Sequence, residues 1–161
     1  MSKSSPLSHL DAQGDSRMVN VGEKGKTERV AIAEATVFFP DQAAGLVYKG
    51  QGPKGSIQEI VKVAGIQAAK RTSDLIPMCH PLALDHIEIQ LHLDEVGSTI
   101  SIQCRCQVEA KTGVEMEAMV GASVAALTLY DMTKSLNKGI SIQETRLLRK
   151  SGGKSGEWTA Q

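Results

Sequence analysis

Hydrophobic and polar residues alternate in three stretches of the chain, as they do in strands that bury one face. The first stretch, RVAIAEATVFF at 29–39, is rich in β-branched and aromatic residues near its end and predicts a strand. The other two, at 85–95 and 99–110, are separated by the turn residues Val96-Gly97-Ser98. This pair predicts a β-hairpin.

Two further stretches repeat apolar residues at the spacing of a helix. A helix from Ser56 to about Thr72 is expected to begin with a capping box between Ser56 and Glu59. Its predicted buried face is Ile57, Ile60, Val61, Ala64 and Ala68. The stretch 114–137 is apolar on more than one face, which predicts a helix buried against both a sheet and another subunit. Residues 140–148 then supply a last strand.

The predicted order of strand, helix, hairpin, helix and strand indicates an α+β protein. We expect the ferredoxin-like split β-α-β arrangement, an antiparallel sheet with two main helices on one face, plus a short extra helix within 41–50. The 161 residues suffice for one domain. Residues 1–17 are expected to be a disordered tail, and 18–161 to form the domain, with a mobile basic segment at 149–158.

Composition narrows the function classes. The 18 basic and 18 acidic residues cancel, and aromatic residues make up 3%, so neither nucleic acid nor a membrane surface is an expected partner. The stretch 118–130 is the longest apolar run and is too short to span a bilayer, and the polar start of the chain has no leader pattern. Three cysteines without a CxxC pair argue against disulfides and structural zinc, and Cys104 and Cys106 fit the apolar face of a strand. A reducing, cytoplasmic location is expected.

Polar residues without an obvious structural role are candidates for chemistry. His80 lies between two prolines in PMCHP at 77–81, beside Cys79, and its imidazole can exchange a proton near neutral pH. A histidine that only fixes the turn is the simpler interpretation. As a nucleophile pair, Cys79 and His80 are poorly placed because successive side chains diverge.

The predicted long helix carries charged residues at both ends. Glu115 and Glu117 fit the positive end of the helix dipole, but in a buried helix one of them must face something other than solvent. Asp131 and Lys134 form either a weak ion pair at (i, i+3) or an acid-base couple. Glu117 and Asp131 are 14 residues apart, or roughly 21 Å along a helix. Either these two residues serve different sites, or antiparallel helices from two subunits bring Glu117 of one copy near Asp131 of the other.

A basic, glycine-rich segment follows the last strand. Six basic residues face one acidic residue between 134 and 154, and Lys54 stands in a separate glycine-rich loop. Leu148 occupies the place of the first glycine of a P-loop, so this motif is incomplete. The segment is either a basic tail or a lid that closes over a phosphate chain.

Four stretches together resemble the cyclic pyranopterin monophosphate synthase family. A member of this family is the second enzyme of molybdenum cofactor biosynthesis. They are GIQAAKRTSDLIPMCHPL at 65–82, KTGVEMEAM at 111–119, ASVAALTLYDM at 122–132 and RLLRKSGGKSG at 146–156. The resemblance implies a lyase that converts (8S)-3′,8-cyclo-7,8-dihydroguanosine 5′-triphosphate, a cyclised GTP derivative, to cyclic pyranopterin monophosphate with release of diphosphate. It also implies a homohexamer, a trimer of dimers with its sites at the dimer interface.

The resemblance also assigns roles to residues by matching motif. Asp131 and Lys134, with His80 and Lys54, are implied as catalytic. The implied substrate-binding positions are Met78, Cys79, His80, Glu115, Met116, Glu117, Arg29, Lys150 and Lys154. No metal site and no protein-bound cofactor are implied, and magnesium can accompany the substrate's triphosphate.

Two other classes compete with this interpretation. A non-catalytic nucleotide-binding module could use the same scaffold, because a fold does not determine function. It would have no use for an acid-base couple such as Asp131 and Lys134. An RNA-binding domain is disfavoured because the predicted strands lack the stacking aromatics that such domains use.

Overall fold

The computed structural model of the 161-residue chain describes residues 9–11, 13–50 and 56–161. Its strands are β1 (Thr27–Phe38), β2 (His86–Asp94), β3 (Thr99–Ala110), β4 (Ser141–Ser151) and β5 (Trp158–Thr159). Its α-helices are α1 (Ala44–Tyr48), α2 (Ile57–Lys70), α3 (Thr72–Leu75) and α4 (Glu115–Thr133), and a 3-10 turn covers Pro40–Gln42. The predicted α+β class is confirmed.

Within the described residues the five strands form one sheet in the order β2-β3-β1-β4-β5, and every pairing is antiparallel. β1 and β2 therefore run in the same direction with β3 between them, and β3 and β4 run in the same direction with β1 between them. Helix α2 connects the first pair and α4 the second. This is the split β-α-β order that the sequence predicted.

The alternating patterns mark the buried face of the sheet. In β3, Ile100, Ile102, Cys104 and Cys106 are fully buried, as predicted, and the three cysteines of the chain are free thiols. Many of the buried positions of β1 and of α4 are occupied by alanine: Ala31, Ala33, Ala35, Ala118, Ala122, Ala125 and Ala126. Small side chains on both surfaces allow the helix to lie close to the central strand.

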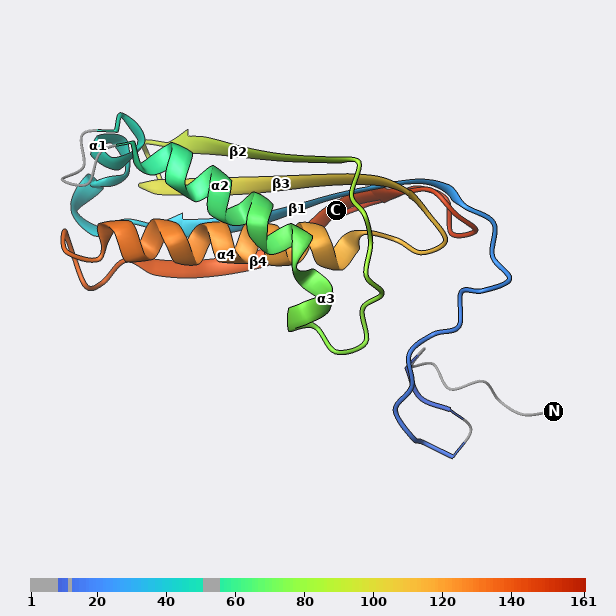
Figure 1. Cartoon of the computed structure of the whole chain (residues 1–161). Coiled ribbons are helices and arrows are strands. Elements are labelled where there is room, and N and C mark those ends of the chain that lie inside the picture. The colour runs from blue at the N-terminus through green and yellow to red at the C-terminus, as the bar shows by residue number, and fades with distance from the viewer. Residues whose placement is uncertain (1–8, 12, 51–55) are drawn as a thin grey trace.

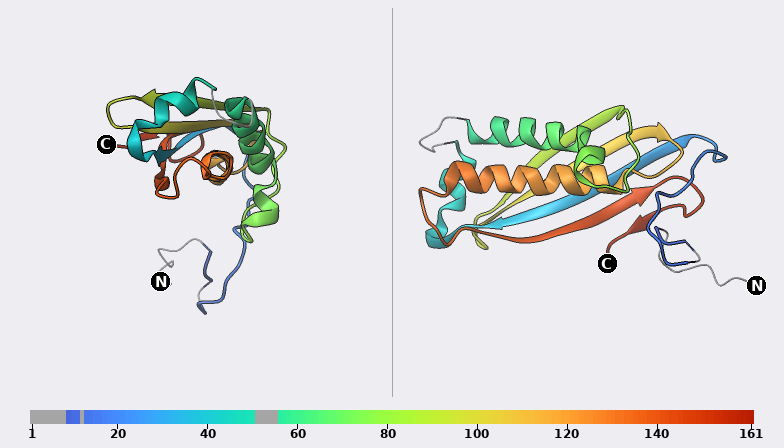
Figure 2. Two further views of the ribbon diagram at one scale, coloured as in Figure 1. Left: turned by 90° about the vertical axis from the view of Figure 1, so that its left-hand side faces the viewer. Right: turned by 60° about the horizontal axis from the view of Figure 1, so that its bottom comes forward.

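Helices α2 and α4 lie side by side on one face of the sheet, and the other face carries no described helix (Figures 1 and 2). The two helices are in close contact at a pair of glycines. A Cβ atom on Gly65 would lie 3.0 Å from the carbonyl oxygen of Gly121, and one on Gly121 would lie 2.5 Å from Sγ of Cys104. Neither position has space for a side chain.

Three local predictions for the helices were wrong. Ser56 precedes α2 but its side chain makes no cap hydrogen bond, and Glu59 instead pairs with Lys62 at 2.8 Å. Ile60 is 43% exposed, because the contact face of α2 is rotated toward Gly65, where α2 meets α4.

Helix α4 ends at Thr133, four residues before the predicted end. The hydroxyl of Thr133 donates to the carbonyl oxygen of Leu129 at 2.7 Å, and the backbone N–H of Leu136 donates to the carbonyl oxygen of Thr133 at 2.8 Å. Asn137 then accepts from the backbone N–H of Gly139 at 2.7 Å. The backbone contact of Leu136 and the side-chain contact of Asn137 close turns in place of a further turn of helix.

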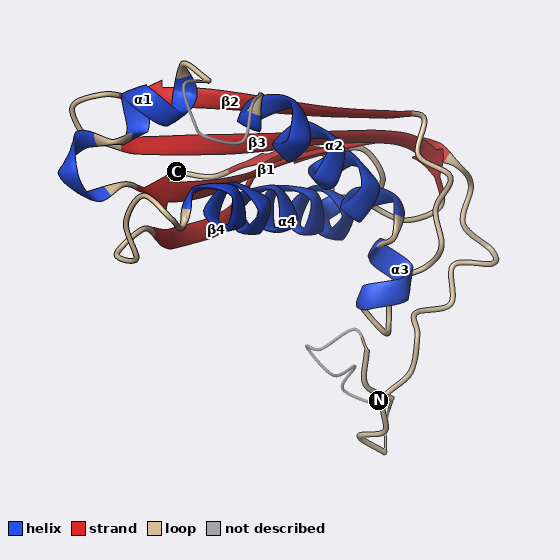
Figure 3. Ribbon diagram, turned by 60° about the vertical axis from the view of Figure 1, so that its left-hand side comes forward, coloured by secondary structure: helices blue, strands red, loops and turns tan. Residues whose placement is uncertain are grey.

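The basic C-terminal segment forms a β-hairpin. Strand β4, which is labelled in Figure 3, extends past the predicted end at 148 to Ser151. Its residues Arg149 and Lys150 pair with Thr159 and Trp158 of β5. The carbonyl oxygen of Leu148 also accepts from the backbone N–H of Ala160 at 2.8 Å. The turn between β4 and β5 is therefore attached to the sheet at both ends.

Candidate functional site

The start of α4 brings together residues that are distant in the sequence. Glu115 opens the helix, where free backbone N–H groups favour a carboxylate. Nζ of Lys150 lies 3.0 Å from Oε1 of Glu115, and both side chains are about two-thirds buried. A Cβ atom on Gly113 would lie 2.7 Å from Cδ of Glu115, so the carboxylate occupies the space left by the glycine. The ion pair joins α4 to the end of β4.

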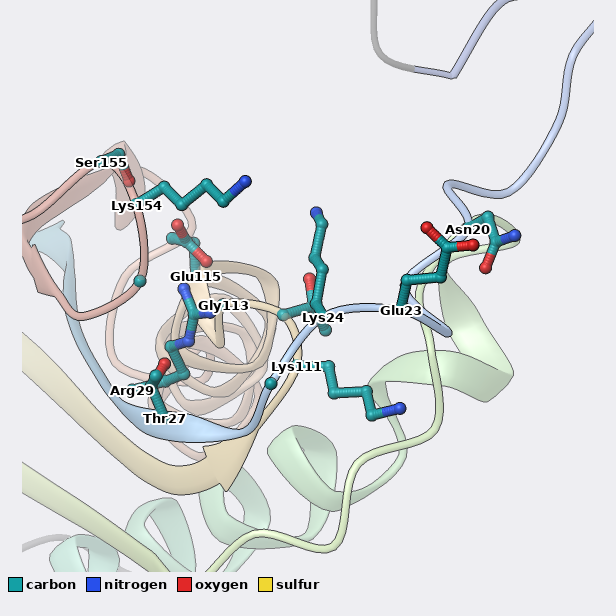
Figure 4. A pocket seen from close by; sticks show the side chains of 13 residues that line it. Asn20, Glu23, Lys24, Thr27, Arg29, Lys111, Gly113, Glu115, Lys154 and Ser155 are labelled. Atoms are coloured by element: carbon teal, nitrogen blue, oxygen red, sulfur yellow. The ribbon is translucent and has the colours of Figure 1, made fainter.

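A cavity of about 1050 Å³ adjoins this ion pair (Figure 4). The turn before α4, the start of β1, the N-terminal segment and the β4–β5 turn surround it. Its charged lining residues are Glu23, Lys24, Arg29, Lys111, Glu115 and Lys154. Four cationic groups and two carboxylates leave a formal charge of +2, which suits a polyanion. Arg29, Glu115 and Lys154 were predicted from the sequence, and the structure brings them together.

Part of this lining was missed by sequence reasoning. Residues 20–25 fold back against the turn that precedes α4, and Nζ of Lys111 donates to the carbonyl oxygen of Gly22 at 2.6 Å. Lys111 is the first residue of the motif KTGVEMEAM, so the sequence did contain an indication that it belongs to the site. Lys24 lies in a polar segment whose path depends on contacts with residues nearly 90 positions away.

Glu117 points into the protein one half-turn further along α4. The side chain is 4% exposed, and its burial raises the pKa of the carboxyl group to about 7, with a smaller contribution from the charge of Glu115. Near neutral pH, this group can therefore both accept and donate a proton.

The loop at 77–81 contributes half-buried side chains close to the same end of α4. Burial raises the pKa of the Cys79 thiol, and the charge of Glu117 raises it further. The backbone N–H of Cys79 donates to the carbonyl oxygen of Ile76 at 3.1 Å, which fixes the loop after α3. Met78 and His80 are also half-buried, whereas Met116 is 39% exposed.

The other end of α4 is different. Nζ of Lys134 donates to Oδ1 of Asp131 at 2.6 Å, and these side chains are 56% and 63% exposed. The hydrogen bond and the charge of Asp131 raise the pKa of Lys134. Neither residue lines the cavity. Asp131 lies 14 residues of helix, or roughly 21 Å, from Glu117. One chain therefore does not bring together all the predicted site residues.

One predicted catalytic residue, Lys54, lies outside the residues that the structure describes. Among residues 9–11, 13–50 and 56–161, no group of three or more His, Cys, Asp or Glu side chains is placed to hold a metal ion. In the same part of the chain, no helix is long and apolar enough to cross a membrane.

Residues 18–153 match the model of the MoaC family. The chain belongs to the MoaC family. It is 52% identical over 160 residues to a protein of Bordetella avium (strain 197N) named cyclic pyranopterin monophosphate synthase, and the match covers 98% of both chains. A protein of the same name from Heliobacterium modesticaldum (strain ATCC 51547 / Ice1) is 48% identical over 153 residues, covering 95% of this chain and 96% of the relative.

The match to the MoaC family extends over both ends of α4. It begins before the segment that lines the cavity and ends at Gly153, one residue before Lys154. The predicted resemblance to this family is thus confirmed. The roles that it implies for single residues stay predictions.

Proposed function

We propose that the chain is a cyclic pyranopterin monophosphate synthase that acts in molybdenum cofactor biosynthesis. The proposed reaction converts (8S)-3′,8-cyclo-7,8-dihydroguanosine 5′-triphosphate to cyclic pyranopterin monophosphate and releases diphosphate. The observation that carries the proposal is the similarity, near half identity over almost the whole chain, to relatives that bear this name. The geometry at the start of α4 supports it.

The cavity supports a role in holding the triphosphate. Lys24, Arg29, Lys111 and Lys154 line it with amines and a guanidinium. Displacement of diphosphate places negative charge on leaving oxygens, and nearby cations stabilise that charge in the transition state. We therefore assign triphosphate binding to this end of the molecule. Any magnesium is expected to arrive with the triphosphate rather than on a site of the chain.

Glu117 supports a role in proton transfer. Rebuilding a purine into a pterin requires repeated protonation and deprotonation of nitrogen and oxygen atoms, and a group with a pKa close to the working pH does this best. Burial brings the pKa of Glu117 to about 7. Cys79 lies near enough for the charge of Glu117 to raise its pKa, so the loop of Met78 and His80 adjoins the same place.

We further propose that two copies of the chain complete each site. Asp131 and Lys134 lie at the opposite end of α4 from Glu117, so one chain cannot place them on one substrate. A two-fold axis would bring the end of one α4 near the start of another. Apolar side chains remain exposed along this helix, with Leu127 at 57% and Met116 at 39%, and a partner chain would cover them. Three such dimers would form the expected homohexamer.

The proposal is tested by incubating the purified chain with the cyclised triphosphate and identifying the products by liquid chromatography and mass spectrometry. One cyclic pyranopterin monophosphate and one diphosphate are expected per substrate consumed. Tight binding without turnover would instead support a non-catalytic nucleotide-binding module. Sedimentation of the same sample tests the assembly, and a stable, active monomer would contradict the shared site.

A further inference from the structure

The turn between β4 and β5 contains three glycines with left-handed backbone conformations. Their φ angles are +101° at Gly152, +70° at Gly153 and +65° at Gly156. Conformational strain would disfavour other residues at all three positions. The three positions differ, however, in the atoms that an added Cβ atom would meet. This difference separates positions that need glycine only for its φ angle from positions that also have no space for a side chain.

At Gly153 the space for a side chain is filled by the head group of Arg29. A Cβ atom there would lie 2.5 Å from Cζ and 2.7 Å from Nη2 of Arg29. At Gly152 a Cβ atom would overlap the carbonyl oxygen of Glu28, which is backbone and cannot easily move. At Gly156 no atom would lie within 4 Å of a Cβ atom.

The side chain of Arg29 carries a buried polar atom. Within the described residues, Nε of Arg29 is buried and has no hydrogen-bond partner. The side chain rises from β1 beside Glu115 and the turn that carries Lys154 and Ser155 (Figure 4). The bare backbone of Gly153 therefore forms part of the surface against which the guanidinium packs.

We propose that Gly153 is a positioning residue for Arg29. The absence of a side chain lets the guanidinium lie against the turn, where its planar fork faces the cavity and can bind two phosphate oxygens of a polyphosphate. This inference rests on the proposed function, because it assigns Arg29 to the triphosphate. It also gives the two adjacent glycines of SGGKSG a role other than flexibility. Gly152 leaves space for the backbone of Glu28, and Gly153 leaves space for the guanidinium of Arg29.

Alanine at Gly153 is expected to act on binding more than on stability. The atoms that it would displace are the far end of a flexible side chain, which can rotate away at little cost to the fold. The guanidinium would then leave its place in the cavity. Gly156→Ala is the matched control, because it imposes nearly the same strained φ without displacing any atom.

The experiment compares steady-state kinetics of wild type, Gly153→Ala, Gly156→Ala, Arg29→Ala and the double variant Arg29→Ala/Gly153→Ala. We expect Gly153→Ala to raise KM by about tenfold or more with a smaller loss of kcat, and Gly156→Ala to raise KM by no more than about threefold. Without the guanidinium, Gly153→Ala should add no more than about twofold to the effect of Arg29→Ala. Denaturant midpoints of the two alanine variants should agree.

Equal KM values for the two alanine variants would overturn the inference, as would additive effects in the double variant. If the wild type makes no product, the proposed function fails, and the same five proteins are compared by calorimetry with inorganic tripolyphosphate. Weaker binding in Gly153→Ala than in Gly156→Ala would then uphold the positioning role. Equal binding by the two variants, or no binding by wild type, would overturn it.

Discussion

The two ends of α4 carry similar charged groups in opposite surroundings. At its start, Glu115 pairs with a half-buried lysine beside a cavity, and Glu117 is buried with a pKa raised to about 7. At its end, Asp131 and Lys134 pair in the open, with more than half of each side chain exposed. At the start of α4, the partners of the charged groups come from the same chain. The end carries a carboxylate and an amine without an enclosure, as the proposed site shared between two copies requires.

The largest effect is expected from the exposed end. Asp131→Asn should lower kcat by about a thousandfold or more, because it removes the proposed proton-transfer group, while triphosphate binding stays within about tenfold. Turnover and calorimetric binding measure the two quantities. Glu59→Gln is the control, since Glu59 forms a pair of the same spacing with Lys62 at 2.8 Å. Turnover by Asp131→Asn near the wild-type rate would remove this residue from the mechanism.

A stability change is expected from the buried end. Burial raises the pKa of Glu117 from 4.5 to about 7, so the folded protein holds this proton more tightly than the unfolded chain. The charged carboxylate therefore costs stability above about pH 7, and the cost vanishes as the pH falls toward 4.5. Glu117→Gln should unfold with a free energy about 3 kcal/mol higher than wild type at pH 8.

Chemical denaturation at pH 8 and pH 5 measures this difference, which should shrink at the lower pH. Glu115→Gln serves as the control because Glu115 is partly exposed and pairs with Lys150. A gain of equal size at both pH values would show that the charge of Glu117 is not its cause.

The shared site predicts that two inactive variants restore each other. In a mixed dimer of Glu117→Gln and Asp131→Asn, one site receives both substitutions and the other receives neither. Random mixing makes half of the dimers mixed, so about a quarter of wild-type activity should return. Co-refolding equal amounts of the two variants tests this. If the mixture remains as inactive as its components, each site lies within one chain.

The smallest effect is expected on the stability of the exposed end. Lys134→Ala should change the melting temperature by no more than about 1 °C, because exposed ion pairs contribute little. The raised pKa of Lys134 keeps its ammonium charged throughout neutral pH, so the shift should not vary between pH 6 and 8. Scanning calorimetry of this variant beside Lys62→Ala provides the comparison. A large drop for Lys134→Ala alone would assign it a structural role.

The sequence predicted those parts of the fold that depend on local periodicity. The alternation in β1 and β3 marked the buried face because a strand has a side-chain period of two. The end of α4 was predicted poorly, since the turn after Thr133 is closed by a backbone hydrogen bond and by the side chain of Asn137, contacts that no apolar pattern records. Ile60 was misplaced because close contact between Gly65 and Gly121, rather than side-chain size, sets the face of α2.

The site was predicted in part, for a related reason. Motifs identified Arg29, Glu115 and Lys154, and the structure places them around one cavity. Lys24 was missed because its position depends on the N-terminal segment folding back to Lys111. Such contacts are set by tertiary packing across most of the chain, and spacing along the sequence carries no record of them.

The glycine contact between α2 and α4 has a consequence for engineering. Replacing a helical glycine by alanine is a common way to stiffen a protein and raise its melting temperature. Here an added methyl group on Gly121 would press on Cys104 of β3 and push α4 away from the sheet, one turn from Glu117. Glu117 lies on the same helix, so it would shift relative to the loop of Cys79. The absence of a side chain at Gly121 thus helps to set the position of Glu117 against that loop.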